Sequence, residues 1–357
     1  MQEPSTPRIP EYLDCAAFLV ENNLITQANP SAINHGVSVG ANILDMIRIG
    51  SQEYTSFQSG KLYLQLDIAG MNHHAGVTIH EGAHLFCIHS NYESSELQAL
   101  ALASSHLREP LQKALMGIEL LTNKLTDDES DALSPQINQI NHGLHQLLRT
   151  IGNMSDASSF PQIRLSLFEY LDMQSLFWEF SETLRAYSPN LNRTFRFSGP
   201  GKPVYTMADR QALERAFYNL ISNAVKFSPA GSTINITMSA EGKRLQFTVE
   251  NVCESTSIPA VQYFDRYLRK PGIEDLRYGI GLGLPVIRTI AFAHRGTLLV
   301  MPAKSGKITF TMSIAIQNNN AHVLNAPNGF RLNITGGYDT SLVELSDVLT
   351  NDMYATD

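Results

Sequence analysis

The sequence predicts an α+β chain with several domains. Its 357 residues exceed an ordinary single core, since domains usually hold about 100–200 residues. Short apolar runs alternate with turn residues over positions 16–89, heptad-spaced apolar residues follow, and helix-like and strand-like patterns mix from about Leu165 onward. These observations predict, in chain order, a small strand-rich module, a helical hairpin and a mixed α/β domain.

Composition and charge exclude several classes of protein. The hydrophobic fraction of 43% and the charged fraction of 17% are globular values. A net charge of -8 argues against a general nucleic-acid or anionic-membrane binder, because neither polyanion is attracted to an acidic surface. No stretch reaches the roughly 18 apolar residues of a membrane helix, and the opening MQEPSTPRIP lacks the apolar core of a signal peptide. We therefore expect a cytoplasmic protein with no nucleic-acid or membrane partner, and we expect its three well-separated cysteines to be free thiols.

Residues 1–92 are expected to form the strand-rich module. Apolar runs such as AAFLV, KLYLQLDI and HLFCI are bounded by turn residues, which is typical of strands and hairpins. The opening FLVENNLITQANPSA, followed by VGANILDMI and a run of strands, resembles PAS-type sensor domains, which implies a PAS-like sensor module. Its histidines favour ordinary surface and hairpin positions over a metal or haem site, because the adjacent His73 and His74 point to opposite faces of a strand.

Residues 93–154 carry two heptad-spaced seams that predict a helical hairpin. The first seam consists of Leu97, Leu100, Ser104, Leu107, Leu111, Ala114, Ile118, Leu121 and Leu125. The second consists of Ile137, Ile140, Leu144, Leu147, Ile151 and Met154. The acidic stretch TDDESDALSP suits the turn between them, and SDASSFPQ, residues 155–162, has the composition of a linker. Because one hairpin buries only one stripe per helix, we expect a homodimer in which two hairpins form a four-helix bundle.

The segment DRQALERAFYNLISNAVKF, residues 209–227, predicts a helix with three polar residues on one face. Asn219, Asn223 and Lys226 are spaced by four and three positions, so they share roughly that face. Amide oxygens suit magnesium, with Asn223 the candidate metal ligand, and a lysine supplies a counter-charge for phosphate. The alternative is a surface helix with an accidental polar face.

The glycine-rich stretch GIGLGLPVIRTIAFAHRGTL predicts a second helix that begins near Leu284. Gly279, Gly281 and Gly283 precede it, and glycines at a helix N-terminus let backbone amides approach phosphate, where the helix dipole also favours negative charge. The stretch FDRYLRK lies upstream of these glycines.

Together these segments resemble the catalytic domain of sensor histidine kinases from about Leu165 to Ile316. NLISNAVK resembles the asparagine box of that family, FDRYLRK its phenylalanine box and GIGLGL its second glycine box. The resemblance implies an ATP- and magnesium-binding domain over residues 163–317, with the two-layer α/β sandwich of the GHKL ATPases. It also implies that Asn219, Asn223 and Lys226 carry the metal and the phosphates.

One box of the family departs from its usual pattern. Where an Asp is usually followed by two glycines, this chain has VENVCESTSIP, which aligns Asn251 with the adenine-facing acid and Cys253 with the first glycine. An amide oxygen still accepts a hydrogen bond from the adenine amino group, but more weakly than a carboxylate. The resemblance therefore implies adenine contact at Asn251 with reduced ATP affinity, and loss of adenine binding is the alternative.

The stretch SSHLREPL, residues 104–111, resembles the phosphoacceptor box of the same family with a displacement of one residue. Alignment on LREPL places Ser105 at the position of the acceptor histidine and His106 at the position of the acid. Only His106 offers an imidazole that forms a phosphoramidate, and Glu109, three positions later, is a candidate base. The alternative is an exposed helix histidine with no chemistry.

The resemblance implies a cytoplasmic, dimeric sensor histidine kinase. It would take a phosphoryl group from Mg-ATP onto His106 and pass it to an aspartate on a response regulator receiver domain. Two alternatives stay open: a pseudokinase scaffold that binds ATP without phosphotransfer, and a serine kinase that acts on Ser105 or on a partner protein. Residues 318–357 match no motif, and the sequence leaves their role open.

Overall fold

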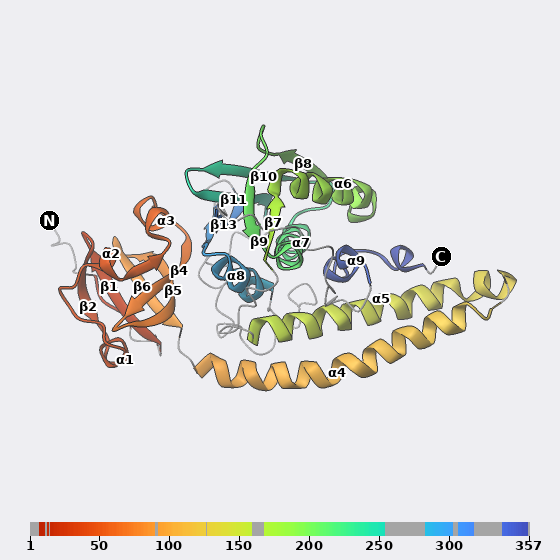
Figure 1. The fold of residues 1–357 in the computed structure, drawn as a ribbon, viewed down its shortest axis with the longest axis horizontal. Helices are drawn as coiled ribbons and strands as arrows, with labels where there is room; N and C mark the ends of the chain where they lie inside the picture. The colour runs from red at the N-terminus through yellow and green to blue at the C-terminus, as the bar shows by residue number, and fades with distance from the viewer. Residues whose placement is uncertain are drawn as a thin grey trace.

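The computed structural model describes residues 7–10, 13, 15–89, 92–125, 127–158, 168–253, 283–302, 306–317 and 338–355. Figure 1 shows a strand-rich N-terminal module, a long helical hairpin, a mixed α/β domain beside the hairpin, and a C-terminal segment that lies along one hairpin helix. The mixed α/β architecture expected from the sequence is confirmed. The PAS-like assignment and the dimeric bundle remain predictions.

The N-terminal module is built on an antiparallel sheet with the strand order β2-β1-β6-β5-β4, to which β3 adds a short pairing with β4. Its strands are β1 (Ala16–Glu21), β2 (Leu24–Ala28), β3 (Ile47–Ile49), β4 (Lys61–Ile68), β5 (Met71–His80) and β6 (Ala83–His89). The short helices α1 (Pro30–Asn34), α2 (Ile43–Met46) and α3 (Ser51–Thr55) lie between β2 and β4 in the chain. Phe18 and Phe86 are cross-strand neighbours whose rings stack at 4.9 Å in the core, so the strands and hairpins expected here are confirmed.

The hairpin consists of α4 (Tyr92–Thr122) and α5 (Asp127–Ser158), which pack against each other. The turn between them is shorter than the sequence predicted, because α5 already begins at Asp127 and carries Pro135 inside the helix. Acidic residues in a first helical turn favour the positive end of the helix dipole, which explains why the acidic stretch is helical rather than a loop. The helix also continues to Ser158, past the predicted start of the linker at Ser155.

The two predicted seams are only partly buried within one chain. The hairpin core contains Leu111 and Ile151 from the seams, together with Leu115 and Leu148 from outside them. Other large apolar side chains of the hairpin are exposed, among them Leu102, Leu107, Met116, Leu120, Leu121, Leu133, Ile140 and Leu147. The hairpin therefore leaves part of its apolar surface uncovered within the described chain.

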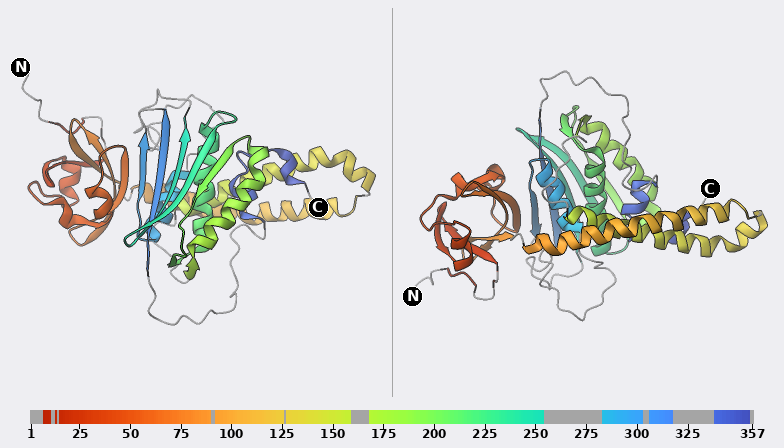
Figure 2. Two further views of the ribbon diagram at one scale, coloured as in Figure 1. Left: turned by 90° about the horizontal axis from the view of Figure 1, so that it is seen from above. Right: turned by 60° about the horizontal axis from the view of Figure 1, so that its bottom comes forward.

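The mixed domain packs three helices against a sheet (Figure 2). Its helices are α6 (Met173–Leu191), α7 (Arg210–Phe227) and α8 (Gly283–Ala293). Its strands are β7 (Glu169–Asp172), β8 (Thr194–Ser198), β9 (Tyr205–Ala208), β10 (Thr233–Glu241), β11 (Arg244–Val252), β12 (Leu298–Pro302) and β13 (Lys307–Ala315). Strands β12, β13, β11, β10 and β8 are adjacent in that order, with β8 parallel to β10, and β7 and β9 form a separate pair. Alternate residues of β10, β11 and β13 face the helices, which gives this sheet its buried apolar side.

The sheets of the module and of the mixed domain join edge to edge. Strand β4 pairs antiparallel with β12, with Tyr63 opposite Leu298. The ring of His74 on β5 stacks on Phe292 of α8 at 4.5 Å, and Glu53 of α3 accepts hydrogen bonds from two residues of the mixed domain, one of them Ser313 at 2.9 Å. These contacts connect the N-terminal module directly to the end of α8.

The C-terminal segment, residues 338–355, contains α9 (Thr340–Glu344) and the short 3-10 helix η5 (Asn351–Tyr354). Both lie against α5, and α9 also lies against α7. Leu345, Leu349 and Tyr354 are part of the same buried core as the mixed domain. Residues 338–355, the described portion of the stretch that matched no motif, thus form an integral layer of this domain.

Among the helices that the structure describes, none combines the length and the apolar character needed to cross a membrane.

Candidate functional site

Helix α7 forms the floor of the candidate site. It is capped at its start by Asp209, whose side chain accepts from Ala212 N, and the backbone N–H of Asp209 donates to His294 Nε2 at 3.0 Å. Burial lowers the pKa of His294, so the ring is held neutral as an acceptor. This bond fixes the start of α7 against the end of α8.

The apolar face of α7 is fully buried and its polar face is turned toward α5, α8 and α9. The buried apolar residues are Leu213, Ala216, Phe217, Leu220, Ile221 and Ala224. The polar residues Arg215, Asn219 and Ser222 are also buried. Asn223 and Lys226 are only partly buried, so the predicted polar face exists but is covered at its centre.

The structure brings Asn219, Asn223 and Gly283 together. A Cβ atom added at Gly283 would lie 3.1 Å from Asn219 Oδ1 and 3.7 Å from Asn223 Nδ2. Gly283 is the first residue of α8, so the N-terminus of that helix faces the two asparagines. Gly279 and Gly281, also predicted to contact phosphate, lie outside the described residues.

Asn251, the predicted adenine contact, lies near the end of β11 and is only 1% exposed. Its Nδ2 donates to the Val252 carbonyl at 3.0 Å. Its Oδ1 is buried and has no hydrogen-bond partner among the described residues. Buried acceptors are normally satisfied, so this oxygen fits a position that receives a donor from a bound group such as an adenine amino group.

The predicted phosphate-binding side chains contact two carboxylates from the C-terminal segment. Asn219 Nδ2 donates to Glu344 Oε2 at 2.8 Å, and Lys226 Nζ forms an ion pair with Asp347. The sequence did not point to Glu344 and Asp347, because they come from a segment without a motif. Their acidic side chains carried no local signal that would place them on α7.

Two arginines complete this charged cluster. Arg215 Nε lies 2.7 Å from Glu344 Oε1, with side chains 3% and 2% exposed. Arg149, from α5, donates to Asn219 Oδ1 at 3.2 Å and forms an ion pair with Asp347. Burial would raise the pKa of Asp347, but the charges of Arg149 and Lys226 outweigh it and hold the pKa below its usual value. Asp347 is therefore ionised at neutral pH, and the contacts of the cluster link α5, α7 and α9.

The predicted phosphoacceptor region lies on α4 and is not brought to this cluster. His106 is exposed and makes no hydrogen bond or ion pair within the described part of the chain. Glu109, the candidate base, is paired instead with Lys113 at 2.6 Å on the surface of the helix. The side chain of Ser105 lies outside the described residues.

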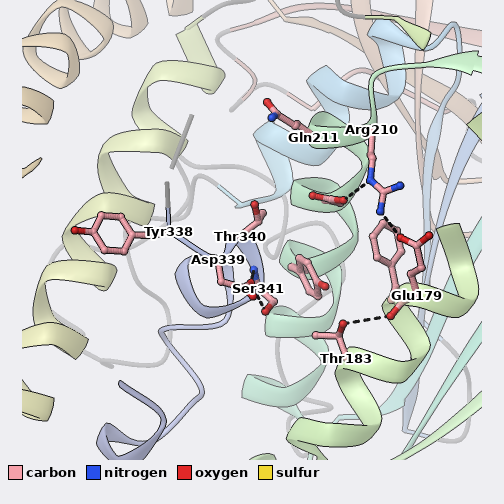
Figure 3. Close-up of a pocket in the computed structure, with 11 residues that line it drawn as sticks. Glu179, Thr183, Arg210, Gln211, Tyr338, Asp339, Thr340 and Ser341 are labelled. Atoms are coloured by element: carbon pink, nitrogen blue, oxygen red, sulfur yellow. Dashed lines mark hydrogen bonds and ion pairs between the residues drawn. The ribbon is translucent and has the colours of Figure 1, made fainter. Parts of the chain in front are cut away.

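A separate polar pocket of about 350 Å³ lies between α6, α7 and the start of the C-terminal segment (Figure 3). Arg210 projects into it and bridges Glu179 and Glu214, while Tyr338 and Asp339 border the opposite side. Of the residues predicted to bind nucleotide, the described ones, Asn219, Asn223, Lys226, Asn251 and Gly283, do not line this pocket. It lies instead beside the start of the C-terminal segment.

Comparison with known protein families gives a match over residues 208–318. The matching family is described as histidine kinase-, DNA gyrase B-, and HSP90-like ATPase. The matched range contains α7, Asn251 and Gly283, which form the candidate site. The expected resemblance to sensor histidine kinases is thereby confirmed, as it is by curated relatives.

Several curated relatives are histidine kinases or sensor proteins. Histidine kinase P4 of Formosa agariphila is 24% identical over 62% of this chain and 16% of the relative. Sensor protein KdpD of Escherichia coli is 28% identical over 61% of this chain and 24% of the relative. Histidine protein kinase DivJ of Caulobacter vibrioides is 28% identical over 56% of this chain and 34% of the relative. The chain thus spans about a third or less of the length of these relatives.

Among solved structures, full-length ShkA in complex with AMPPNP is 21% identical, with a TM-score of 0.49, over 62% of this chain and 47% of that chain.

Proposed function

We propose that this chain, whose residues 208–318 belong to the histidine kinase-, DNA gyrase B- and HSP90-like ATPases, is a sensor histidine kinase. It takes a phosphoryl group from Mg-ATP onto His106 and passes it to an aspartate on a response regulator receiver domain. Residues 1–92 are the PAS-like sensor module, residues 93–154 the phosphotransfer hairpin of a homodimer, and residues 163–317 the ATP-binding domain of a cytoplasmic protein.

The convergence of Asn219, Asn223 and the first residue of α8 carries this proposal. Gly283 has no side chain, and a Cβ there would crowd Asn219 Oδ1 at 3.1 Å. The backbone of the α8 N-terminus is thus kept close to two amide side chains. Helix N-termini favour anions and amide oxygens suit hard cations, so this corner fits a metal-bound polyphosphate.

The residues divide into groups with distinct roles toward the nucleotide. Asn223 would be the direct oxygen ligand of magnesium, and Lys226 would neutralise phosphate charge. The Oδ1 of Asn251, which has no partner among the described residues, would accept from the adenine amino group. Bound Mg-ATP supplies the phosphoryl group. The chain's own contribution is to orient it and to present an exposed imidazole at His106, with Glu109 released from Lys113 as the base.

A phosphorylation assay tests the acceptor. Purified protein incubated with labelled ATP and magnesium should carry an acid-labile, base-stable label, because phosphoryl groups on imidazole nitrogen hydrolyse in acid. His106→Gln should remove this label and Ser105→Ala should leave it. Label that survives acid would assign the acceptor to Ser105 or another hydroxyl instead.

Calorimetry tests the nucleotide site independently of phosphotransfer. Asn223→Ala should abolish magnesium-dependent ATP binding, since it removes the metal ligand. Asn190→Ala is a matched control, because that amide contacts Asp352 on the surface at 3.1 Å and not the site. Unchanged magnesium-dependent affinity in Asn223→Ala would remove the basis of the assignment.

The pairing of Glu109, the candidate base, with Lys113 favours a second candidate, a pseudokinase scaffold that binds ATP without phosphotransfer. ATP binding without any label in the same assay would support that candidate.

A further inference from the structure

The C-terminal segment, residues 338–355, places two acids on the face of α7 where phosphate groups are expected. Glu344 is 1% exposed, and its two oxygens contact Arg215 Nε at 2.7 Å and Asn219 Nδ2 at 2.8 Å. Asp347 forms ion pairs with Lys226 and Arg149. Carboxylate and phosphate oxygens are both anionic acceptors for the same charged and amide donors.

Resting on the function proposed above, we propose that this segment is an internal competitor of the nucleotide, in which Glu344 and Asp347 occupy the donors that ATP needs. The kinase is then autoinhibited when the segment is seated. Binding of Mg-ATP and seating of the segment exclude each other at Lys226 and Asn219.

The charge balance of the cluster explains why either occupant is acceptable. Buried cations require an anionic partner, because leaving one unpaired is costly. The folded arrangement around this cluster is therefore stable only when acids or phosphates lie against its three cations, Arg149, Arg215 and Lys226. With the segment seated, the two carboxylates supply this charge within the chain itself.

Contacts with α5 hold the segment in place. The ring of His142 stacks on Tyr354 at 4.6 Å, and its Nε2 lies 2.5 Å from the carbonyl oxygen of Ser346. Asn141 Nδ2 also donates to the Tyr354 carbonyl at 3.3 Å. Since α5 belongs to the hairpin, the seated segment fastens the hairpin to α7 as well as covering the site.

The edge of the segment near its start borders a polar cavity. The polar pocket in Figure 3 separates Tyr338, Asp339 and Thr340 from Glu179 and Arg210. Water that enters this cavity would compete with the polar contacts at this end of the segment. Release of the segment would uncover Leu345, Leu349 and Tyr354, which are part of the buried core of the mixed domain.

Calorimetry with Mg-ATP on the full chain tests the competition. We compare the wild type with Asp347→Asn, Glu344→Gln and a chain truncated after Gln317. The apparent affinity for Mg-ATP is reduced by the fraction of molecules whose segment is released. If only ~1–10% of molecules have the segment released, binding is weakened by ~10–100-fold. We expect the truncation to bind Mg-ATP tighter by this factor and Asp347→Asn to recover a large part of it.

Asp352→Asn is the matched control. It removes the same charge from the same segment, but Asp352 contacts Asn190 on the surface rather than α7. Its affinity for Mg-ATP should equal that of the wild type. An equal gain in Asp352→Asn and Asp347→Asn would mean that general electrostatics, not occupancy, sets the affinity, and would overturn the inference.

Hydrogen exchange supplies a second readout that does not require the truncated chain to fold. Saturating Mg-ATP should increase amide exchange over residues 338–355 of the wild type, because the nucleotide displaces the segment. If wild type and truncation bind equally and exchange does not change, the autoinhibition is wrong while the kinase assignment stands. If Mg-ATP binds to none of the variants, the proposed function fails and this inference fails with it.

Discussion

Replacing the buried guanidinium of Arg215 by the apolar side chain of methionine should destabilise the protein strongly. The side chains of Arg215 and Glu344 are 3% and 2% exposed, and Arg215 Nε lies 2.7 Å from Glu344 Oε1. In Arg215→Met, Glu344 keeps its hydrogen bond from Asn219, and its Oε2 still lies 3.6 Å from Arg149 Nε. It nevertheless loses its principal counter-charge in a site that water does not reach.

The expected cost follows from the burial of both partners. Breaking a buried ion pair by removing one partner costs about 3–5 kcal/mol, and the remaining bond from Asn219 places this case near the lower end. About 3 kcal/mol converts to a drop of ~6–12 °C in Tm, at ~2–4 °C per kcal/mol for a unit of this size. The double variant Arg215→Met/Glu344→Leu should recover most of the loss, because neither charge then remains buried.

Thermal and urea unfolding of four proteins measure this: the wild type, both variants and the control Lys113→Met. Lys113 pairs with Glu109 at 2.6 Å with side chains 72% and 75% exposed, so its removal should change stability by less than ~1 kcal/mol. A loss in Arg215→Met as small as that in Lys113→Met would show that the C-terminal segment does not bury Glu344 on α7. The same conclusion would follow if the double variant were less stable than Arg215→Met alone.

Three further outcomes are expected. Leu107 and Leu147 are 49% and 53% exposed on the hairpin. The double variant Leu107→Asp/Leu147→Asp should therefore dissociate the expected homodimer, as measured by light scattering. A wild type that is monomeric at micromolar concentration would contradict the four-helix bundle. Burial, followed by neighbouring positive groups, lowers the pKa of His74 to about 3, so below its unfolded pKa of ~6.5 only the unfolded chain gains the proton. The contribution of the neutral His74 ring to the free energy of unfolding should be fully present above about pH 6.5 and fall by ~1.4 kcal/mol per pH unit below it. In His74→Phe the loss of stability between about pH 6.5 and 5 should be shallower. Parallel curves of stability against pH for the two proteins would refute the lowered pKa of His74. Gly283→Ala should weaken Mg-ATP binding, because the new Cβ would lie 3.1 Å from an asparagine oxygen of α7, while Gly201→Ala, with nothing within 4 Å, should bind as the wild type does in calorimetry.

Local sequence patterns determined the helices and strands of the site. The apolar spacing in residues 209–227 predicted a helix, and α7 spans Arg210–Phe227 with the expected apolar positions buried. The glycine-rich stretch predicted a helix from near Leu284, and α8 begins at Gly283. Periodicity sets these elements because a buried face must repeat at the helical period, whatever lies opposite.

The hairpin shows where such patterns stop being sufficient. Heptad spacing predicted two helices, but not which stripe faces the other helix of the same chain. In the structure Leu111 is buried while Leu107 is 49% exposed. Spacing fixes a helical face, and only the packing partner decides whether that face is covered.

The charged cover of the site and the joined sheets were decided by the tertiary structure alone. Strand β4 pairs with β12 through backbone groups, which every residue carries, so no side-chain pattern encodes that pairing. Glu344 meets Asn219 across 125 positions, and Asp347 meets Lys226 across 121. From the sequence, an acidic residue in a stretch without a motif is expected to be exposed to solvent. It becomes a partner for α7 only because Leu345, Leu349 and Tyr354 bury the segment beside it, and burial makes a paired charge necessary.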